Sequence, residues 1–237
     1  MRRVCTIVAC AVPLATTGMA SVLTNGDFAN GFAPNIVDGG ESLSVGSTAM
    51  PGWTVVGANP IAWAPSGLWP GVTSAVDSAY VLDLTGYDDP DTESWGGIEQ
   101  TVDLAAGNYA LTFYLGQIND PSLPQFSYPV SVDVSAGDQS DIPVTDTNEA
   151  LDTIAGQTDW QMETLNFTVS SAGPTTIEIV GLSAGTNLSA NGNFIGLDDV
   201  DLEATPEPGT ALLVSLIVAG LLFKSRRNTI CDLRRTE

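Results

Sequence analysis

The central part of this chain lacks positively charged side chains. The sequence contains no His, and all 7 of its Lys and Arg residues lie outside the stretch from Val4 to Phe223. Phosphate and nucleic-acid binding depend mainly on such cations. Schiff-base catalysis needs a lysine, and a histidine is the most frequent general base. These classes of function, nucleic-acid binding among them, are therefore excluded for residues 21–205.

Cysteine is absent from the same region. The 3 cysteines are Cys5, Cys10 and Cys231, so residues 21–205 can form no disulfide, thiol nucleophile or Cys/His zinc site. All but three of the 28 acidic residues lie in this region. Its surface chemistry is thus restricted to carboxylates, hydroxyls, amides and aromatic rings.

The first 20 residues have the pattern of a secretory signal peptide. Arg2 and Arg3 are followed by an apolar stretch at 4–14 and by small residues up to Ala20. This order predicts a signal helix that signal peptidase cleaves after Ala20. Two alternatives are an ordinary first helix of the fold and a lipoprotein site at Cys10, before which the apolar stretch is short.

A second apolar segment lies at residues 209–223 and is followed by a basic stretch. At ~1.5 Å per residue, a helix over this segment is about 22 Å long, shorter than the ~30 Å hydrocarbon core of a bilayer. Cations follow the segment and none lies between it and residue 20. The positive-inside rule therefore places residues 228–237 in the cytoplasm and 21–205 outside. The alternative is a buried core helix.

A three-part motif spans residues 206–227. Pro206, Glu207 and Pro208 come first, the apolar segment 209–223 follows, and a basic cluster ends at Arg227. This order resembles the PEP-CTERM sorting signal. The resemblance implies transient anchoring in the inner membrane by the C-terminal helix, processing by an exosortase, and delivery to the cell surface or extracellular matrix. The extra segment 228–237 departs from the pattern, because such proteins usually end soon after the basic cluster.

Short runs of alternating apolar and polar residues dominate residues 21–205. Leu111, Phe113 and Leu115, for example, are separated by Thr112 and Tyr114. An antiparallel strand that is buried on one face needs this period of two. Strands are expected at 52–57, 79–85, 98–104, 111–116, 130–135, 160–170, 177–179 and 193–203. Together they predict an all-β domain, a two-sheet sandwich or jelly roll.

Two of the expected strands change phase midway. Trp160 and Met162 give way to Leu165, and Ile195 gives way to Val200. Each change predicts a β-bulge. Turns are expected at 106–108, 136–138 and 172–174, and long loops at 116–129 and 145–159.

Five short motifs follow one another along this domain. They are Asn25-Gly26-Asp27-Phe28, Pro51-Gly52-Trp53-Thr54-Val55, Ser78-Ala79-Tyr80-Val81-Leu82-Asp83-Leu84, Trp160 ahead of Phe167, and Gly196-Leu197-Asp198-Asp199-Val200. In this order they resemble the choice-of-anchor C family over residues 22–203. The resemblance implies a galactose-binding-like jelly roll, as in many carbohydrate-binding modules. It also implies a non-catalytic extracellular domain that is associated with polysaccharide.

The same resemblance implies a structural calcium site. Related jelly rolls hold Ca²⁺ between their first and last strands, and Asp27, Asp198 and Asp199 occupy or adjoin the matching positions. Oxygen ligands suit this hard cation. One departure is Ala29, which stands where the family has a glutamate. The alternative is that Asp27 caps a turn while Asp198 and Asp199 are ordinary strand-end acids.

A second acidic cluster lies around Gly86 and Pro90. Its members are Asp83, Asp88, Asp89, Asp91 and Glu93. The cluster could hold a surface calcium ion. Blocks of like charge usually repel one another and stay hydrated, however. We therefore expect a solvated loop.

Aromatic side chains are the candidates for carbohydrate binding, because an exposed ring offers a sugar an apolar face to stack on. Trp53 and Trp160 lie within strand patterns and are expected to pack in the core. Four others lie in loop-like sequence near Pro, Ser and Gly, and are the better ligand candidates: Trp63, Trp69, Tyr87 and Trp95. Partial burial is the alternative for each, since large aromatic side chains are usually substantially buried.

Glycoside hydrolysis by an Asp/Glu pair is the enzymatic class that remains open to this composition. Glu99, Glu163 and Glu178 lie on expected strands, but no motif selects a pair. We therefore expect an exported domain that binds glycan or a calcium-bridged anionic matrix and has no enzymatic role. The alternatives are a structural component of the envelope or biofilm matrix without a defined ligand, and a carboxylate-based glycoside hydrolase.

Overall fold

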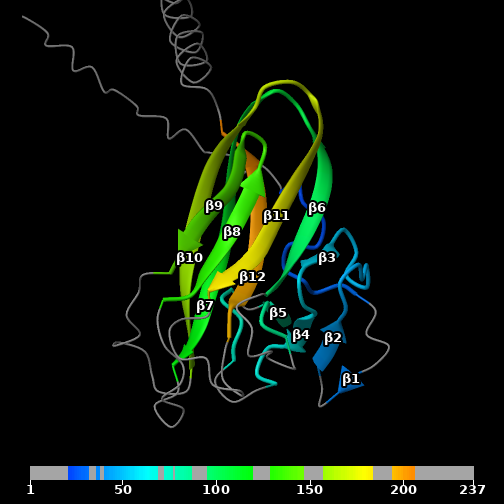
Figure 1. Ribbon diagram of the computed structural model, residues 1–237, viewed down its shortest axis with the longest axis vertical. Coiled ribbons are helices and arrows are strands. Elements are labelled where there is room, and N and C mark those ends of the chain that lie inside the picture. Colours follow the sequence, from blue (N-terminus) through cyan, green and yellow to red (C-terminus); the bar gives the residue numbers. More distant parts are fainter. Residues whose placement is uncertain are drawn as a thin grey trace, which may run out of the picture.

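The computed structural model describes residues 21–31, 36–37, 40–68, 72–76, 78–86, 95–119, 129–146, 157–183 and 194–205. These residues form strands in two antiparallel sheets, with no helix among them (Figure 1). The prediction of an all-β, two-sheet domain is confirmed. The segments predicted as signal peptide (1–20), sorting signal (206–227) and tail (228–237) lie outside the described residues, within which no helix could span a membrane.

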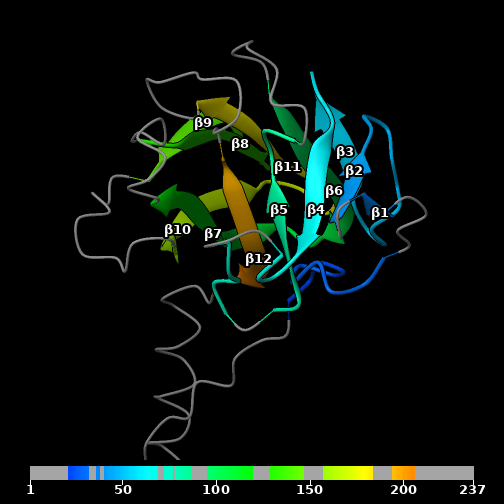
Figure 2. The same cartoon turned by 90° about the horizontal axis from the view of Figure 1, so that it is seen from below.

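The larger sheet contains seven strands and the smaller sheet five. The larger runs in the order β1 (Ile36–Val37), β2 (Gly40–Leu43), β4 (Ile61–Pro65), β5 (Tyr80–Asp83), β12 (Gly196–Ala204), β7 (Gly107–Asn119) and β10 (Gln157–Val169). The smaller runs in the order β3 (Thr54–Gly57), β6 (Gly96–Leu104), β11 (Gly173–Ser183), β8 (Ser131–Ala136) and β9 (Gln139–Thr145). Strands β4, β5 and β12 lie side by side in Figure 2.

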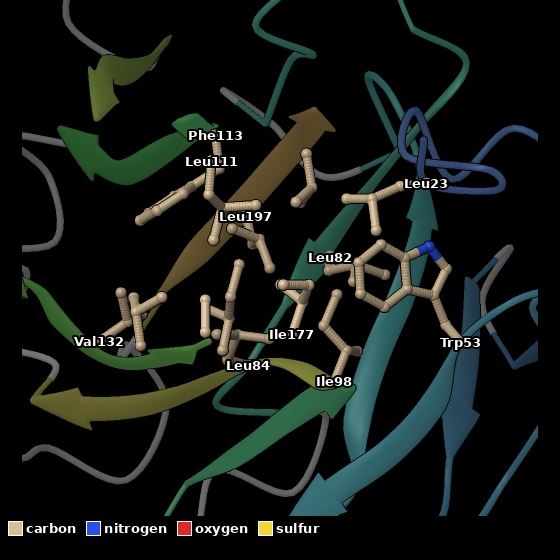
Figure 3. Packing of buried hydrophobic residues seen from close by; sticks show 14 of the residues in the cluster. Leu23, Trp53, Leu82, Leu84, Ile98, Leu111, Phe113, Val132, Ile177 and Leu197 are labelled. Atoms are coloured by element: carbon tan, nitrogen blue, oxygen red, sulfur yellow. The ribbon is translucent and has the colours of Figure 1, made fainter. Parts of the chain in front are cut away.

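One hydrophobic core fills the space between the two sheets (Figure 3). Leu111 and Phe113 of β7 reach it from the larger sheet, and Ile98 of β6 and Ile177 of β11 reach it from the smaller. All four side chains are fully buried, as the alternation of their strands predicts. Burial of each such side chain contributes roughly 1.5–3 kcal/mol, so this layer holds the two sheets together.

The two expected bulges have different outcomes. The pairing of β12 with β7 shifts register between Asp198 and Asp201, which confirms the bulge predicted in 193–203. The pairing of β10 with β7 is unbroken from Gln157 to Val169, so the bulge predicted in 160–170 is wrong. The phase of the apolar residues in β10 changes because Trp160 lies on the outer face of the sheet rather than in the core.

A polar residue in β6 ties the first residues of the domain to the sandwich. Gln100 is buried, and its side-chain Oε1 accepts a hydrogen bond from the Thr24 backbone N–H at 2.8 Å. Its Nε2 donates to the Thr24 carbonyl at 3.0 Å. The same segment also lies along β12, because the Val22 N–H donates to the Leu202 carbonyl and the Val200 N–H donates to Gly26. Gln100, which interrupts the apolar phase of its strand, therefore closes the N-terminal edge of the core.

Candidate functional site

Trp63 and Trp95 are both buried in the core, which corrects the expectation that they are exposed to a ligand, and Trp63 lies in a strand rather than in a loop. Trp63 belongs to β4, is 3% exposed, and donates its indole N–H to the Phe28 carbonyl at 3.0 Å. Its ring stacks on Tyr80 with centroids 4.6 Å apart. Trp95 is 2% exposed and directly precedes β6. Neither indole offers a free face to a sugar.

The other two aromatic candidates, Trp69 and Tyr87, lie outside the described residues, as do Asp88, Asp89, Asp91 and Glu93 of the second acidic cluster. The remaining member, Asp83, ends β5 and is buried, contrary to the expectation of a solvated acid. Its Oδ1 accepts hydrogen bonds from the Thr85 N–H at 3.0 Å and from the Thr85 hydroxyl at 2.7 Å. Asp83 therefore shapes the turn after β5.

Asp198, one of the three predicted calcium ligands, is buried and holds a loop in place. Its Oδ2 accepts hydrogen bonds from the Ser74 hydroxyl at 2.9 Å and from the Ala75 N–H at 2.8 Å, and its Oδ1 accepts one from the Ser78 hydroxyl at 3.0 Å. Burial raises the pKa of Asp198, while these hydrogen bonds oppose the rise. The carboxylate is thus engaged by the 72–78 loop (residues 72–76 and 78).

Asp27 and Asp199, the other two predicted ligands, lie near each other. Asp27 is exposed, and its Oδ1 accepts a hydrogen bond from the Ala29 N–H at 3.2 Å. Asp199 occupies the bulge of β12 with a φ of 46°. Burial, then Asp198, Asp201 and Asp27 raise the pKa of Asp199. Among the described residues, however, no three acidic side chains are close enough to hold a metal ion together.

The outer face of the larger sheet carries an aromatic residue that sequence reasoning assigned to the core. Trp160 of β10 lies opposite Gly116 of β7, which lies opposite Gly196 of β12. A Cβ on Gly116 would come within 2.3 Å of Trp160 Cε3, and one on Gly196 within 2.9 Å of Cη2. The indole therefore lies across two neighbouring strands, on a shelf that exists because both positions lack side chains.

The 72–78 loop fixes the orientation of this indole. The Trp160 Nε1–H donates to the Thr73 carbonyl at 2.7 Å. Next to it, Val72, Phe194 and Val81 form a small apolar cluster, against which the partly buried Trp160 packs. Because Asp198 binds the same loop, the hydrogen bonds of a buried carboxylate and of an indole N–H hold one edge of the site.

Polar and apolar side chains continue from Trp160 along the outer face. The next residue of β10 on this face is Met162, which is 58% exposed and lies opposite the partly buried Tyr114 of β7. Thr164 and Thr112 form the following pair. We call the surface formed by Trp160, Met162, Tyr114, Thr112 and Thr164 the platform. It combines an aromatic and thioether surface with hydroxyl groups, and this mixture suits a sugar.

Of the three glutamates considered for catalysis, the structure pairs two. Glu99 of β6 and Glu178 of β11 lie directly opposite each other on the smaller sheet. Burial, then Glu99 and Asp141 raise the pKa of Glu178. Glu163 lies in the other sheet, on β10, and burial raises its pKa. Pairing between distant strands could not be read from local sequence, which is why no pair was predicted.

No family model matches the chain, and no curated protein matches it. Solved structures that resemble it include carbohydrate-binding modules and sugar-binding proteins, and also the enzymatically active domain of a bacteriophage tailspike protein and a GH115 glucuronidase. A CBM4 module shares 16% identity, with a TM-score of 0.38, over 77% of this chain and 99% of the module.

Two further likenesses are of the same kind. The CBM22-1 xylan-binding domain of Paenibacillus barcinonensis Xyn10C shares 15% identity over 71% of this chain and 94% of that domain, with a TM-score of 0.37. The EclA C-terminal domain, a sugar-binding protein, shares 13% identity over 44% of this chain, with a TM-score of 0.31. The chain spans 64% of that structure's length. None of these likenesses identifies a family.

Proposed function

We propose that this protein is an exported, non-catalytic glycan-binding protein whose platform binds the sugar. The observation that carries the proposal is the placement of Trp160 across Gly116 and Gly196. A ring that is already fixed by packing and by its bond to Thr73 loses little conformational freedom when a ligand stacks on it. The glycine shelf thus presents a preorganised aromatic surface on the outside of the sandwich.

The chemistry around the platform favours a polyhydroxylated ligand over a charged one. Residues 21–205 contain no Lys, Arg or His, so an anionic ligand would find no counter-ion there. The platform instead offers the hydroxyls of Thr112, Thr164 and Tyr114, which can both donate and accept hydrogen bonds. Extracellular polysaccharide is the partner class that uses both features.

Retention on a panel of immobilised polysaccharides tests this function with purified full-length protein. We expect Trp160→Ala to weaken retention about tenfold, which corresponds to ~1.4 kcal/mol. Thr101→Ala is the matched control, because Thr101 is exposed on the smaller sheet, away from the platform. Equal retention of the Trp160 variant and the wild type would contradict the platform. Failure of the wild type to bind any glycan would favour a purely structural matrix component.

A glycoside hydrolase is the second candidate, because Glu99 and Glu178 lie opposite each other and the pKa of Glu178 is raised. Glycosidases use two carboxyl groups, one of which needs a raised pKa to act as the acid. Release of reducing sugars from the same polysaccharides, abolished by Glu178→Gln, would support this alternative. The absence of any release by the wild type would argue against it.

Export and sorting form the second half of the proposal and rest on the sequence. We expect signal peptidase to cleave after Ala20 and an exosortase to process the chain near Pro206, Glu207 and Pro208. Replacement of these three residues by alanine should leave the unprocessed protein in the inner membrane. Cell fractionation with an antibody against the sandwich checks this, and processing that continues in the variant would contradict it.

A further inference from the structure

A polar groove lies where two turns of the sandwich meet, at the opposite end of β10 from Trp160. The turn between β8 and β9 forms one wall, and the connection from β10 to β11 forms the other. The cavity has a volume of about 460 Å³. Pockets that bind small ligands have volumes of roughly 300–1,000 Å³, so the groove is large enough to take a sugar residue.

The first wall is held in place by packing and hydrogen bonding. Gly137 adopts a φ of 58°, and a Cβ at this position would lie 2.4 Å from the Phe167 ring. The turn therefore lies directly against β10. Asp138 accepts a hydrogen bond from the Thr168 N–H at 2.7 Å, and the Thr168 hydroxyl donates to Asn108 at 3.0 Å. These contacts give the groove a defined shape before any ligand arrives.

Hydroxyl groups dominate the lining of the groove. The residues that carry them are Ser135, Ser140, Thr168, Ser170, Ser171, Thr175 and Thr176. Within the described part of the chain, the hydroxyls of Ser170, Ser171 and Thr175 make no hydrogen bond and are available to a ligand. Asp138 and Gln139 add a carboxylate and an amide, and among the residues that the structure describes no cationic or aromatic side chain lines the cavity.

This composition selects one class of ligand. An anion would meet the Asp138 carboxylate without a compensating positive charge, and a flat apolar molecule would leave several hydroxyls without partners. A neutral polyol can satisfy hydroxyls as donors and as acceptors. The lining therefore fits an uncharged sugar residue that is held by hydrogen bonds.

We propose that the groove is a second saccharide-binding site, which takes an uncharged sugar residue through Ser170, Ser171 and Thr175. The proposal rests on the glycan-binding function proposed above, but on different residues. Thr168 lines the groove and lies on the same strand as Trp160, eight residues away. At ~3.3 Å per residue, the two sites are about 26 Å apart along β10, so one extended glycan chain can contact both.

Chemical-shift perturbation on full-length ¹⁵N-labelled protein tests the groove. The probes are cellohexaose, xylohexaose and maltohexaose, with hexagalacturonic acid as the anionic control. We expect one of the neutral probes to shift the amide signals of Ser170, Ser171 and Thr175, and the anionic probe to leave them unchanged. A binding-site variant that combines Ser170→Ala, Ser171→Ala and Thr175→Val should weaken groove binding at least fivefold. Ser42→Ala, on the exposed face of β2, is the matched control.

The outcomes separate the two proposals. Groove shifts that persist in Trp160→Ala support the second site. Shifts confined to the platform overturn the groove and leave the proposed function intact. Groove shifts without platform shifts support the groove and overturn the platform. If none of the neutral probes moves any signal, both proposals fail. A groove variant that binds like the wild type overturns the second site, whatever the platform does.

Discussion

The placement of Trp160 depends on two residues that have no side chain. Gly116 and Gly196 lie opposite each other on β7 and β12, and the indole covers both. Any larger residue at either position would push the ring away from the sheet. At the scale of the single residue, the proposed binding surface is therefore set by what these two positions lack.

Gly116→Ala provides a direct test of this dependence. The new Cβ would lie 2.3 Å from Trp160 Cε3, so the indole must shift and its bond to Thr73 must lengthen or break. We expect a red shift of the tryptophan fluorescence, about tenfold weaker glycan retention, and a stability loss of roughly 1–3 kcal/mol from overpacking. Thr112→Ala on the same strand is the control for fluorescence and stability. Unchanged fluorescence and retention would show that the shelf does not position the ring.

Gln100 is a second residue whose replacement should have a large effect. Its amide forms both hydrogen bonds with the Thr24 backbone, at 2.8 and 3.0 Å, and is buried. Gln100→Leu leaves the backbone N–H and carbonyl of Thr24 without partners, and we expect a loss of about 1–3 kcal/mol. Urea denaturation measures this loss. The control is Asp103→Asn, at an exposed position on the same strand, which should stay within about 0.5 kcal/mol of the wild type. Equal urea midpoints for the two variants would show that the hydrogen bonds of Gln100 with Thr24 do not stabilise the fold.

The positions of the tryptophans show that local sequence does not predict which of them are buried in the core. Trp53 was predicted to pack in the core and does so. The Pro, Ser and Gly residues around Trp63 and Trp95 predict exposed loops, yet both indoles are buried and Trp63 lies in a strand, whereas the strand pattern around Trp160 predicts burial in the core. Which face a strand residue occupies depends on the register with its neighbours. Gly116, which pairs with Trp160, is 44 positions away in the sequence (160 minus 116), so local composition does not reveal the register.

Among the strands, those with one buried face were the predictable ones. Strands β6 and β8 alternate clearly and lie close to their expected positions, whereas the expected segments 111–116 and 177–179 cover only part of β7 and β11. Strand β4 was missed because Ile61, Ala62, Trp63 and Ala64 are all buried, which leaves no alternation to detect. Its outer face is covered by the cluster that contains Val72 and Leu68. A strand that a loop covers is buried on both faces, so its sequence has no alternation of polar and apolar residues by which it could be predicted.

The position of this loop depends on one buried carboxylate. Asp198 holds the 72–78 loop through Ser74, Ala75 and Ser78. In Asp198→Ala these donors lose their acceptor, so we expect the loop to detach and stability to fall by about 3 kcal/mol, because hydrogen bonds to charged groups are the stronger class. Limited proteolysis should then cut within 72–78. Asp201→Ala on the same strand serves as the control. Equal resistance of the two variants to the protease would show that Asp198 does not hold the loop.

For the whole molecule, the excess of acidic groups sets the direction of pH dependence. Burial raises the pKa of Asp198, Asp199, Glu163 and Glu178 above the ordinary values of 3.8 for Asp and 4.5 for Glu. The folded state therefore holds protons that the unfolded chain releases. This contribution is complete below the ordinary values and is lost as the pH rises through the raised ones.

Stability should accordingly increase as the pH is lowered through the raised pKa values of these carboxyl groups. Urea midpoints at pH 8, 7, 6 and 5 measure the trend. Glu178→Gln should make it less steep, because this residue then has no charge to desolvate and none to repel Glu99 and Asp141. The contribution of the exposed Asp138 to stability has the opposite pH dependence, because the hydrogen bond from the Thr168 N–H lowers the pKa of this carboxyl group. That contribution is lost only at pH values below 3.8, outside the measured range. Midpoints that rise with pH between 5 and 8 would contradict the assignment.

A specific calcium site at Asp27 and Asp199 can be tested by varying the ionic strength and the divalent cation. All but three of the 28 acidic residues lie in 21–205, where no cation balances them, so the folded domain repels itself and added salt of any kind should raise the melting temperature. If calcium bridges Asp27 and Asp199, it should raise the melting temperature further than magnesium does at equal ionic strength, because Ca²⁺ accepts irregular oxygen geometry and Mg²⁺ does not. Asp199→Asn should abolish this difference and leave the general salt effect in place. Identical melting temperatures in calcium and magnesium would mean that screening alone stabilises the protein, and that the calcium proposal is wrong.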